Sequence, residues 1–270
     1  LNGEFLLIHL DKRKRRLRVV NDRFTSIPFY YLADSQGFVG SVFYKDLWGW
    51  LKSGSSLKLN KEAFFEFLWL QRILGTKTYD TASKFLPAAS RLVYDGHETS
   101  IETYWTPSFE KTSDSIEACS AGLVDRLTTS IKRKTSDGTE RLGLFLSGGT
   151  DSRTVLASFR NPPVCFTLGI THNNEVQVAR EVATIANAEH IFIQLESDPY
   201  SEHLDAMVQI GGGMYAFDNS LFMGLETQVA AHADVVFHGH GIDYLFQGMY
   251  VPSSPIRILS KRTYLSRLRR

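Results

Sequence analysis

Cysteine and net charge are both scarce in this sequence of 270 residues. Its two cysteines, Cys119 and Cys165, are too few for a disulfide framework or a zinc site built from thiolates, so we expect a reducing, cytoplasmic compartment. The chain has 30 Lys and Arg residues against 29 Asp and Glu residues. This balance provides no overall field that would attract nucleic acid or an anionic membrane.

Long apolar runs are also missing. No stretch approaches the roughly 18 residues that are needed to cross a bilayer, and nothing at Leu1 resembles a signal peptide. We therefore expect a soluble protein with no membrane or nucleic-acid partner. The chain starts at Leu1 rather than at Met and stops inside a basic, helix-like stretch, Lys261 to Arg270, which suggests an internal fragment of a longer protein.

The rest of the composition is that of a globular protein, with 43% hydrophobic and 22% charged residues. At roughly 150 residues per domain, this length favours two domains. The pattern along the chain changes near residue 107. We expect one domain over residues 1–106, a polar linker over residues 107–114 and a second domain over residues 115–270.

The first domain has the pattern of a β-rich fold. Two apolar runs, Phe5–Leu10 and Leu17–Val20, are separated by a charged stretch, as in a hairpin. An aromatic cluster at residues 29–31 opens another strand. Further strands are expected at Phe38–Phe43, Ser90–Tyr94 and Glu102–Trp105. The segment Lys61–Leu70 is expected to be a helix with Asn60 as its N-cap.

In the second domain, short apolar runs alternate with helical patterns. Such runs are typical of strands that are covered on both faces, and their alternation with helices indicates a parallel, doubly wound α/β sheet. The strands are expected at Leu142–Leu146, Val164–Leu168, Ile191–Leu195 and Asp234–Phe237. A helix is expected to follow Asp114 as its N-cap, with Glu117 completing a capping box. Further helices are expected at Asn174–Ala188, Glu202–Ile210 and Leu221–Ala231.

The segment Ser147-Gly148-Gly149-Thr150-Asp151-Ser152 joins the first of these strands to a helix that is expected to begin near Ser152. Ligands bind at the carboxyl ends of parallel strands, and helix N-termini attract phosphate. The two glycines let the backbone approach an anion closely. Asp151 would repel a bare phosphate, which suggests a bridging Mg²⁺. A strand-to-helix turn with incidental glycines is the alternative, and the absence of Gly-Lys-Ser/Thr excludes the usual P-loop.

The hexad Ser-Gly-Gly-x-Asp-Ser resembles the signature of the ATP pyrophosphatases of the PP-loop type. Residues 2–31, 84–88 and 104–105 are similar to the second half of the Ntn-type glutaminase domain of glutamine-hydrolysing asparagine synthetases. Residues 166–169, 174–183 and 238–248 are similar to the synthetase domain of the same family. This resemblance implies a partial glutamine amidotransferase-like domain at 1–106 and a PP-loop synthetase domain, incomplete at its C-terminus, at 115–270.

The resemblance also implies a site for ATP and Mg²⁺ at the ends of three strands. The pyrophosphate would be held by Ser147, Gly148, Gly149, Asp151 and Ser152. The adenine and ribose would lie against Phe145, Leu168, His238 and Gly239. Asp151 and Asp243 match the two carboxylates that serve Mg²⁺ and the phosphates. For Asp243, a helix N-cap is the alternative role.

Three positions depart from the family pattern and bear on the substrate. His240 stands where the family has a glutamate, and Tyr244 stands where it has a second acid. Histidine can transfer a proton but supplies no fixed negative charge, so His240 either acts at the adenylate together with Asp243 or fills the turn. The stretch 211–214 (GGGM) replaces an Asp-Glu-Pro-like segment on the substrate side. The family's N-terminal cysteine nucleophile has no counterpart in this chain.

The activity that the resemblance implies is that of an ATP-dependent amide-forming ligase. A carboxylate would be adenylated with release of pyrophosphate, and a nitrogen nucleophile would then displace AMP. Two alternatives stay open: an amide-closing synthetase that makes β-lactams or macrocyclic peptides, and a degenerate, non-catalytic nucleotide-binding homologue. The expected partners are small molecules, namely a carboxylate acceptor with glutamine or ammonia, and homodimerisation is left open.

Overall fold

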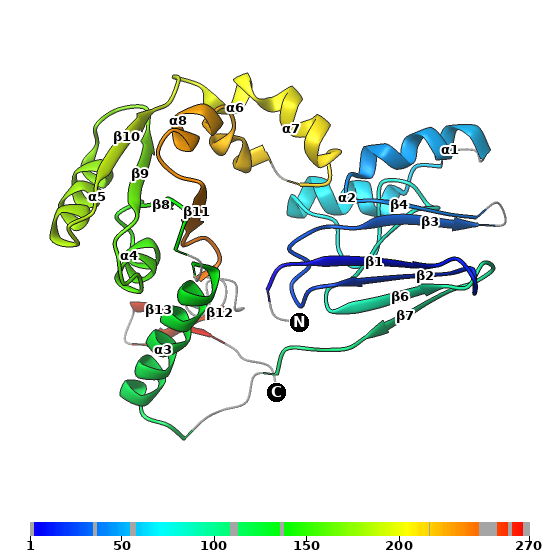
Figure 1. The fold of residues 1–270 in the computed structure, drawn as a ribbon, viewed down its shortest axis with the longest axis horizontal. Coiled ribbons are helices and arrows are strands. Elements are labelled where there is room, and N and C mark those ends of the chain that lie inside the picture. The colour runs from blue at the N-terminus through cyan, green and yellow to red at the C-terminus, as the bar shows by residue number, and fades with distance from the viewer. Residues whose placement is uncertain are drawn as a thin grey trace. The chain divides into compact units, whose positions relative to one another are not determined.

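The computed structural model describes residues 3–34, 37–54, 58–108, 113–135, 138–215, 217–242, 253–258 and 261–266. The chain forms two compact units (Figure 1). Unit 1 comprises Leu1–Thr112 and Pro199–Met223, and unit 2 comprises Ser113–Asp198 and Gly224–Arg270. The sequence placed a single boundary at 107–114, whereas the chain also passes between the units after residues 198 and 223. Separate folding of residues 1–106 and 115–270 stays a prediction.

Unit 1 contains two antiparallel sheets. One has the strand order β1 (Leu6–Asp11), β2 (Arg16–Asn21), β6 (Ser90–Tyr94), β7 (Thr99–Thr103). The other has the order β4 (Gly37–Ser41), β3 (Tyr30–Asp34), β5 (Lys84–Phe85). The expected hairpin and strands are confirmed, although β7 begins before the predicted Glu102 and ends before Trp105. Val19 of β2, Leu92 of β6 and Tyr31 of β3 share one buried cluster, so the two sheets pack against each other.

The helices of unit 1 come from both of its chain segments. A 3-10 helix at Tyr44–Leu47 leads into α1 (Trp48–Gly54), and α2 (Lys61–Leu70) has the predicted bounds. The side chain of Asn60 accepts a hydrogen bond from the Ala63 amide at 3.2 Å, which confirms the predicted N-cap. The second segment supplies α6 (Pro199–Glu202), α7 (Leu204–Gly211) and a 3-10 helix at Phe217–Phe222. The helix predicted at Glu202–Ile210 is therefore present, as two short helices.

The segment 199–223 is attached to the N-terminal part of unit 1 by a core cluster and two hydrogen bonds. Met214 lies in the cluster that contains Tyr30 and Tyr44. The Tyr79 hydroxyl donates to the Gly213 carbonyl at 2.8 Å, and the Tyr30 hydroxyl donates to that of Tyr215 at 3.1 Å. These contacts explain why this part of the chain belongs to unit 1.

Unit 2 is built on a four-stranded parallel sheet, as predicted. Its strand order is β10 (His190–Gln194), β9 (Val164–Gly169), β8 (Leu142–Phe145), β11 (Val235–His238). The chain proceeds from β8 through β9 to β10 in one direction and then returns to add β11 on the other side of β8. The strand order therefore reverses between β8 and β11, and ligands bind at such a switch point in parallel sheets.

The helices of unit 2 differ from the expectation mainly at their first residues. They are α3 (Ile116–Lys134), α4 (Thr150–Ala157), α5 (Asn174–Ile185) and α8 (Glu226–Ala230). Helix α3 is capped by Ser115 rather than by Asp114, because the Ser115 hydroxyl accepts the Ala118 amide hydrogen at 3.2 Å. Helix α8 is shorter than the predicted Leu221–Ala231, since Gly224 has a φ of +76° that no helix continues through.

The basic end of the chain, which we expected to be helix-like, also differs from the prediction. Residues 261–266 form strand β13 (Lys261–Ser266), which pairs antiparallel with β12 (Ser253–Ile258). Thr263, Tyr264 and the facing Ile256 are residue types that favour strands. Arg257, Lys261 and Arg262 therefore lie on the two strands of a hairpin instead of following a helical repeat.

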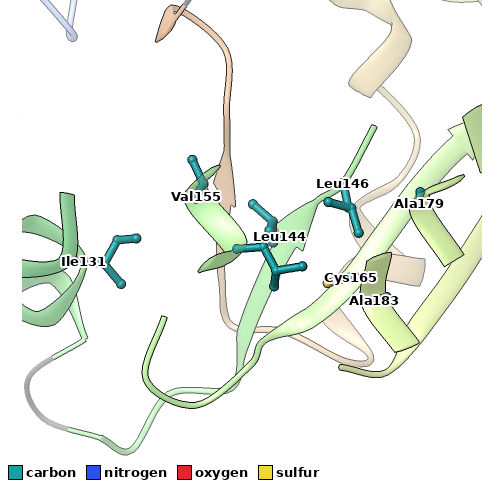
Figure 2. Packing of buried hydrophobic residues seen from close by; sticks show 8 residues of the cluster. Ile131, Leu144, Leu146, Val155, Cys165, Ala179 and Ala183 are labelled. Carbon is teal, nitrogen blue, oxygen red and sulfur yellow. The ribbon is translucent and has the colours of Figure 1, made fainter. Parts of the chain in front are cut away.

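The sheet of unit 2 is covered on both faces, as expected of a doubly wound fold. On one face, strand residues pack with α3, α4 and α5 (Figure 2), in a cluster formed by Ile131, Leu144, Leu146, Val155, Leu156, Cys165, Ala179 and Ala183. On the other face, Phe166 and Ile193 pack with Leu225 and Ala233. Burial raises the pKa of the Cys165 thiol to about 11, which leaves this cysteine as a core residue.

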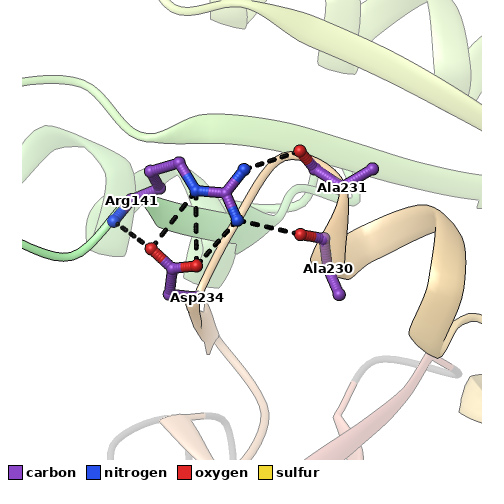
Figure 3. A network of polar contacts seen from close by, with 4 residues as sticks. All are labelled: Arg141, Ala230, Ala231 and Asp234. Carbon is purple, nitrogen blue, oxygen red and sulfur yellow. Dashed lines mark hydrogen bonds and ion pairs between the residues drawn. The ribbon is translucent and has the colours of Figure 1, made fainter.

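The amino ends of β8 and β11 are joined by one arginine (Figure 3). The Arg141 guanidinium pairs with Asp234 at 2.7 Å between Nη2 and Oδ1, and it donates to the carbonyls of Ala230 and Ala231 at 2.9 and 2.6 Å. The network thus holds the end of α8 and the start of β11, at the edge of the sheet opposite to the glycine-rich segment. Within the described ranges, no helix combines the length and apolar character of a bilayer span.

Candidate functional site

The glycine-rich segment lies at the carboxyl edge of the parallel sheet. Strand β8 ends at Phe145, and helix α4 begins at Thr150, directly after the N-cap Gly149. The helix starts before Ser152, so Asp151 and Ser152 lie in its first turn. Strand β11 ends at His238 on the neighbouring side. The two segments therefore meet at the switch point of the sheet, where the N-terminus of α4 adds its partial positive charge.

Hydrogen bonds between two serines give the loop its shape. The Ser147 amide donates to Ser152 Oγ at 3.2 Å, and the two hydroxyls lie 3.2 Å apart. The Gly149 amide donates to Ser147 Oγ at 3.3 Å, and Ser152 Oγ donates to the Gly149 carbonyl at 3.2 Å. Ser152 is buried, whereas Ser147 and Gly149 are exposed. The loop is therefore closed from within by Ser152 and presents Ser147 and Gly149 to solvent.

Gly148 has a conformation and a position that require glycine. Its φ is +70°, and a Cβ built on it would lie 3.1 Å from the Glu175 carbonyl oxygen and 3.2 Å from the Ala179 amide nitrogen. The loop thus rests on the first turns of α5, which Asn173 caps by accepting the Val176 amide hydrogen at 3.1 Å. A pocket of about 320 Å³ opens here, lined by Ser147, Gly148, Gly149, Asn174, Glu175 and Val178.

Gly239 brings the second segment of the site against the first. A Cβ built on Gly239 would lie 2.8 Å from the Ser152 amide nitrogen and 2.9 Å from the Asp151 carbonyl carbon. Both neighbours are backbone atoms of helix α4, so no side chain can be accommodated without moving the loop. The predicted site residues Gly239, Asp151 and Ser152 are therefore in direct contact.

His238 and His240 flank Gly239 and are both exposed. The His240 amide donates to Nδ1 of His238 at 3.2 Å, so this nitrogen is the acceptor and the neutral His238 ring carries its proton on Nε2. The two rings are 6.1 Å apart. Both histidines stand at the carboxyl edge of β11, where the sequence places them, and His240 is accessible to a ligand there.

Phe145 and Leu168 occupy the predicted strand ends but are partly taken up by packing. Both pack against the buried cluster that contains Phe166 and Ile193, and the rings of Phe145 and Phe166 are 6.1 Å apart. They are half-buried, at the ends of the adjacent strands β8 and β9. The structure brings them to one face of the sheet, and contact with adenine or ribose stays a prediction.

The two predicted magnesium ligands have different outcomes. Asp151 is half-buried in the first turn of α4, directly beside the loop. Asp243, together with Tyr244, lies outside the described residues. Across the ranges that are described, no group of three His, Cys, Asp or Glu side chains forms a ready-made metal site. Mg²⁺ that is shared with phosphates requires only one or two carboxylates, so Asp151 fits that mode of binding.

One charged residue at the loop was missed by the sequence interpretation. Arg153 directly follows the hexad, and its Nε lies 3.3 Å from the Gly149 carbonyl oxygen that accepts its hydrogen bond. Its Nη2 lies 3.5 Å from Thr150 Oγ1. The position of Arg153 in the sequence could have indicated this contact, because a helical side chain four residues after the N-cap points back toward the helix start.

Comparison with protein families decides the assignment of unit 2. The family model for asparagine synthase matches residues 122–268, which is more than half of the chain. The chain belongs to the asparagine synthase family. The matched part includes the glycine-rich loop, β11 and both histidines. In this asparagine synthase family chain, residues 1–121 lie outside the match, so the glutaminase-like character of residues 1–106 stays a prediction.

Solved structures share lower similarity with the chain. An NH3-dependent NAD synthetase from Campylobacter jejuni is 17% identical over 48% of this chain and 60% of that chain, with a TM-score of 0.33. An NMN synthetase from Francisella tularensis is 16% identical over 47% of this chain and 57% of that chain, with a TM-score of 0.35. A glutamine-dependent NAD+ synthetase from Acinetobacter baumannii is 12% identical over 90% of this chain and 61% of that chain, with a TM-score of 0.35. The chain covers less than two thirds of each, and no curated protein matches it.

Proposed function

We propose that this chain carries the ATP-binding site of an ATP-dependent, amide-forming ligase. The observation that supports this most directly is the contact of Gly239 with the Asp151–Ser152 backbone at the switch point of the parallel sheet. It joins the two segments that the family resemblance assigns to nucleotide binding. In the proposed reaction a carboxylate oxygen attacks the α-phosphate of ATP, pyrophosphate leaves, and a nitrogen nucleophile then displaces AMP to form an amide.

The loop has the features that a bound pyrophosphate requires. Ser147 and Gly149 are exposed, Gly148 keeps side-chain atoms out of the pocket, and α4 contributes its positive N-terminal end. Asp151 would hold Mg²⁺, which offsets phosphate charge when it is bound. Phe145, Leu168, His238 and Gly239 would border the adenine and ribose. In this proposal Asp243 is a second carboxylate for Mg²⁺ and the phosphates.

His240 is proposed to face the adenylate and to take part in proton transfer or in orienting the nucleophile. Its exposure at the carboxyl edge of β11 supports this role, because a substrate can reach the ring. A histidine in place of the family's glutamate supplies no fixed negative charge at position 240. We therefore propose that His240 accepts a proton from the attacking nitrogen nucleophile and forms no ion pair with the carboxylate substrate.

An amide-closing synthetase is the second candidate, and the absence of acidic residues at 211–213 favours it. Gly212 and Gly213 have φ values of +60° and +71°, and the Gly213 carbonyl accepts the Tyr79 hydroxyl hydrogen. This turn stands where the family has an Asp-Glu-Pro-like stretch, and its glycines supply no carboxylate. Residues 1–106 are proposed to be part of a glutamine amidotransferase-like domain that supplies ammonia.

Product analysis tests the proposed function. The 270-residue chain, alone and within any longer natural protein, is incubated with ATP, Mg²⁺, candidate carboxylic acids and ammonia, and the products are separated by mass spectrometry. We expect AMP and pyrophosphate to form in equal amounts together with an amide. Cleavage to ADP and phosphate, or no nucleotide cleavage with any acid, would contradict the proposal. A reaction without an external amine would select the amide-closing candidate.

A further inference from the structure

We propose that Arg153 is an additional pyrophosphate-binding residue, whose guanidinium is held at the loop to neutralise the leaving pyrophosphate; this inference rests on the proposed function. Arg153 lies outside the Ser-Gly-Gly-x-Asp-Ser hexad, and it is exposed on the first turns of α4. Its side chain nevertheless returns to the loop instead of extending into solvent.

Helix geometry explains the direction of this side chain. Long side chains in α-helices point toward the N-terminus and cover the residues three and four positions earlier. For Arg153 these residues are Thr150 and the N-cap Gly149, and both receive a hydrogen bond from its guanidinium, at Thr150 Oγ1 and at the Gly149 carbonyl. The cation is thereby placed at the helix start, at the carbonyl of Gly149, a residue that lines the pocket.

Two contacts still leave the guanidinium able to bind a phosphate. The hydrogen bonds to the loop use Nε and Nη2, and Nη1 has no acceptor in the described part of the chain. An arginine presents its donors in a planar fork that matches two oxygens of one phosphate. Arg153 can therefore contact the pyrophosphate through Nη1 and the second Nη2 hydrogen while Nε stays on the loop.

The charges around the loop explain why a cation at Arg153 would favour pyrophosphate binding. Asp151 lies in the first turn of α4 and Glu175 lines the pocket, so two acidic residues lie near a ligand that is itself strongly anionic. Mg²⁺ offsets part of this repulsion. Arg153 is the cation whose side chain contacts the loop in the structure as described, and it would stabilise the pyrophosphate as negative charge accumulates on it.

Binding measurements on the 270-residue chain test the inference. Inorganic pyrophosphate, ATP and adenosine are titrated calorimetrically in the presence of Mg²⁺, with wild type, Arg153→Gln and Arg153→Lys. We expect Arg153→Gln to weaken the binding of pyrophosphate and ATP about tenfold, because a charge-assisted hydrogen bond is lost. Arg153→Lys should recover part of this affinity, since it keeps the charge but not the fork. Adenosine, which has no phosphate, should bind all three proteins equally.

The control variant is Arg160→Gln, which changes an exposed arginine beyond the other end of the same helix. It should bind pyrophosphate as wild type does. Wild-type-like pyrophosphate binding by Arg153→Gln would overturn the inference and leave the proposed function standing. An equal loss of adenosine binding would also overturn it, because the effect would then be structural. If wild type binds neither pyrophosphate nor ATP, the proposed function itself fails.

Discussion

Gly239 lies so close to Ser152 that a methyl group in place of its hydrogen would be 2.8 Å from the Ser152 amide nitrogen. Gly239 follows β11, and Ser152 lies in the first turn of α4, which follows β8; the two strands are neighbours only because the sheet order reverses there. Their contact fixes the distance between the glycine-rich loop and the histidines at 238 and 240. A nucleotide site that uses both loops depends on this distance.

Replacement of Gly239 by alanine should therefore damage the site. The added Cβ meets backbone atoms of Asp151 and Ser152, so α4 or the loop must shift, at a cost of about 1–3 kcal/mol in the free energy of unfolding. We expect Gly239→Ala to lower ATP affinity at least tenfold in calorimetric titrations. Gly122→Ala is the control, because nothing lies within 4 Å of a Cβ at that position of α3. It should leave ATP affinity unchanged and increase helix stability by about 1 kcal/mol.

His240 should affect catalysis more than binding. We expect His240→Ala to slow AMP formation about 100-fold, the usual contribution of a positioned acid or base. His240→Glu restores the family's acid and is expected to shift acceptor preference toward aspartate. Mass analysis of AMP and of the amide product, compared for both variants, tests this role. Unchanged AMP formation in both variants would exclude His240 from the mechanism and show that it merely fills the turn.

Tyr79 should hold the segment 199–223 on unit 1. Burial raises the pKa of Tyr79 to about 12, so its hydroxyl is protonated at neutral pH and donates to the Gly213 carbonyl at 2.8 Å. Tyr79→Phe removes this hydrogen bond, which is worth about 1 kcal/mol, and local opening should increase about fivefold. The rate of limited proteolysis within residues 199–223 measures this local opening. Tyr200→Phe, at a half-exposed position of α6, is the control, and equal cleavage of both variants would contradict the prediction.

His190 should make the stability of unit 2 depend on pH. Desolvation, and then the nearby Arg180 and His172, lower the pKa of His190 below its ordinary value of 6.5. The unfolded chain therefore binds a proton at higher pH than the folded chain, so His190 favours folding above about pH 6.5 and this contribution is lost as the pH falls. Its Nε2 lies 2.8 Å from Thr167 Oγ1, which in turn donates to the Leu146 carbonyl.

Urea unfolding at pH 7.5 and pH 5.5 tests this sign. We expect wild type to lose more stability on acidification than His190→Gln does, because glutamine keeps a donor near Thr167 but does not titrate. His97→Gln, at an exposed position of unit 1, should keep the wild-type dependence. An identical pH dependence in wild type and His190→Gln would show that His190 does not contribute.

Local signals explain which parts of the fold could be predicted from the sequence. The strands of unit 2 are short apolar runs between polar turns, and Asn60 is a capping residue directly before a helical pattern, so neighbouring residues suffice to find them. Asp114 and Ser115 are both good caps, and only the position of the Ala118 amide distinguishes them. Residue type alone therefore does not predict which of two adjacent residues caps the helix.

Long-range contacts account for what could not be predicted. The membership of residues 199–223 in unit 1 depends on the bond from Tyr79 to Gly213, which are 134 positions apart. At the site, the hexad located the loop, and the resemblance located His238 and Gly239. The contact of Gly239 with Ser152 follows from the strand order, which periodicity does not reveal. Arg153 was missed because its role depends on a side-chain direction rather than on a motif.

Magnesium-dependent ATP binding by the Asp151→Asn variant tests the central claim most directly. Asp205→Asn is the matched control, since Asp205 also lies in the first turn of a helix, α7 of unit 1. ATP affinity is measured with Mg²⁺ and with chelator for wild type and both variants. We predict that wild type and Asp205→Asn bind ATP tightly only with Mg²⁺, and that Asp151→Asn loses this dependence together with most of its affinity. Wild-type-like, magnesium-dependent binding by Asp151→Asn would contradict the assignment of the loop.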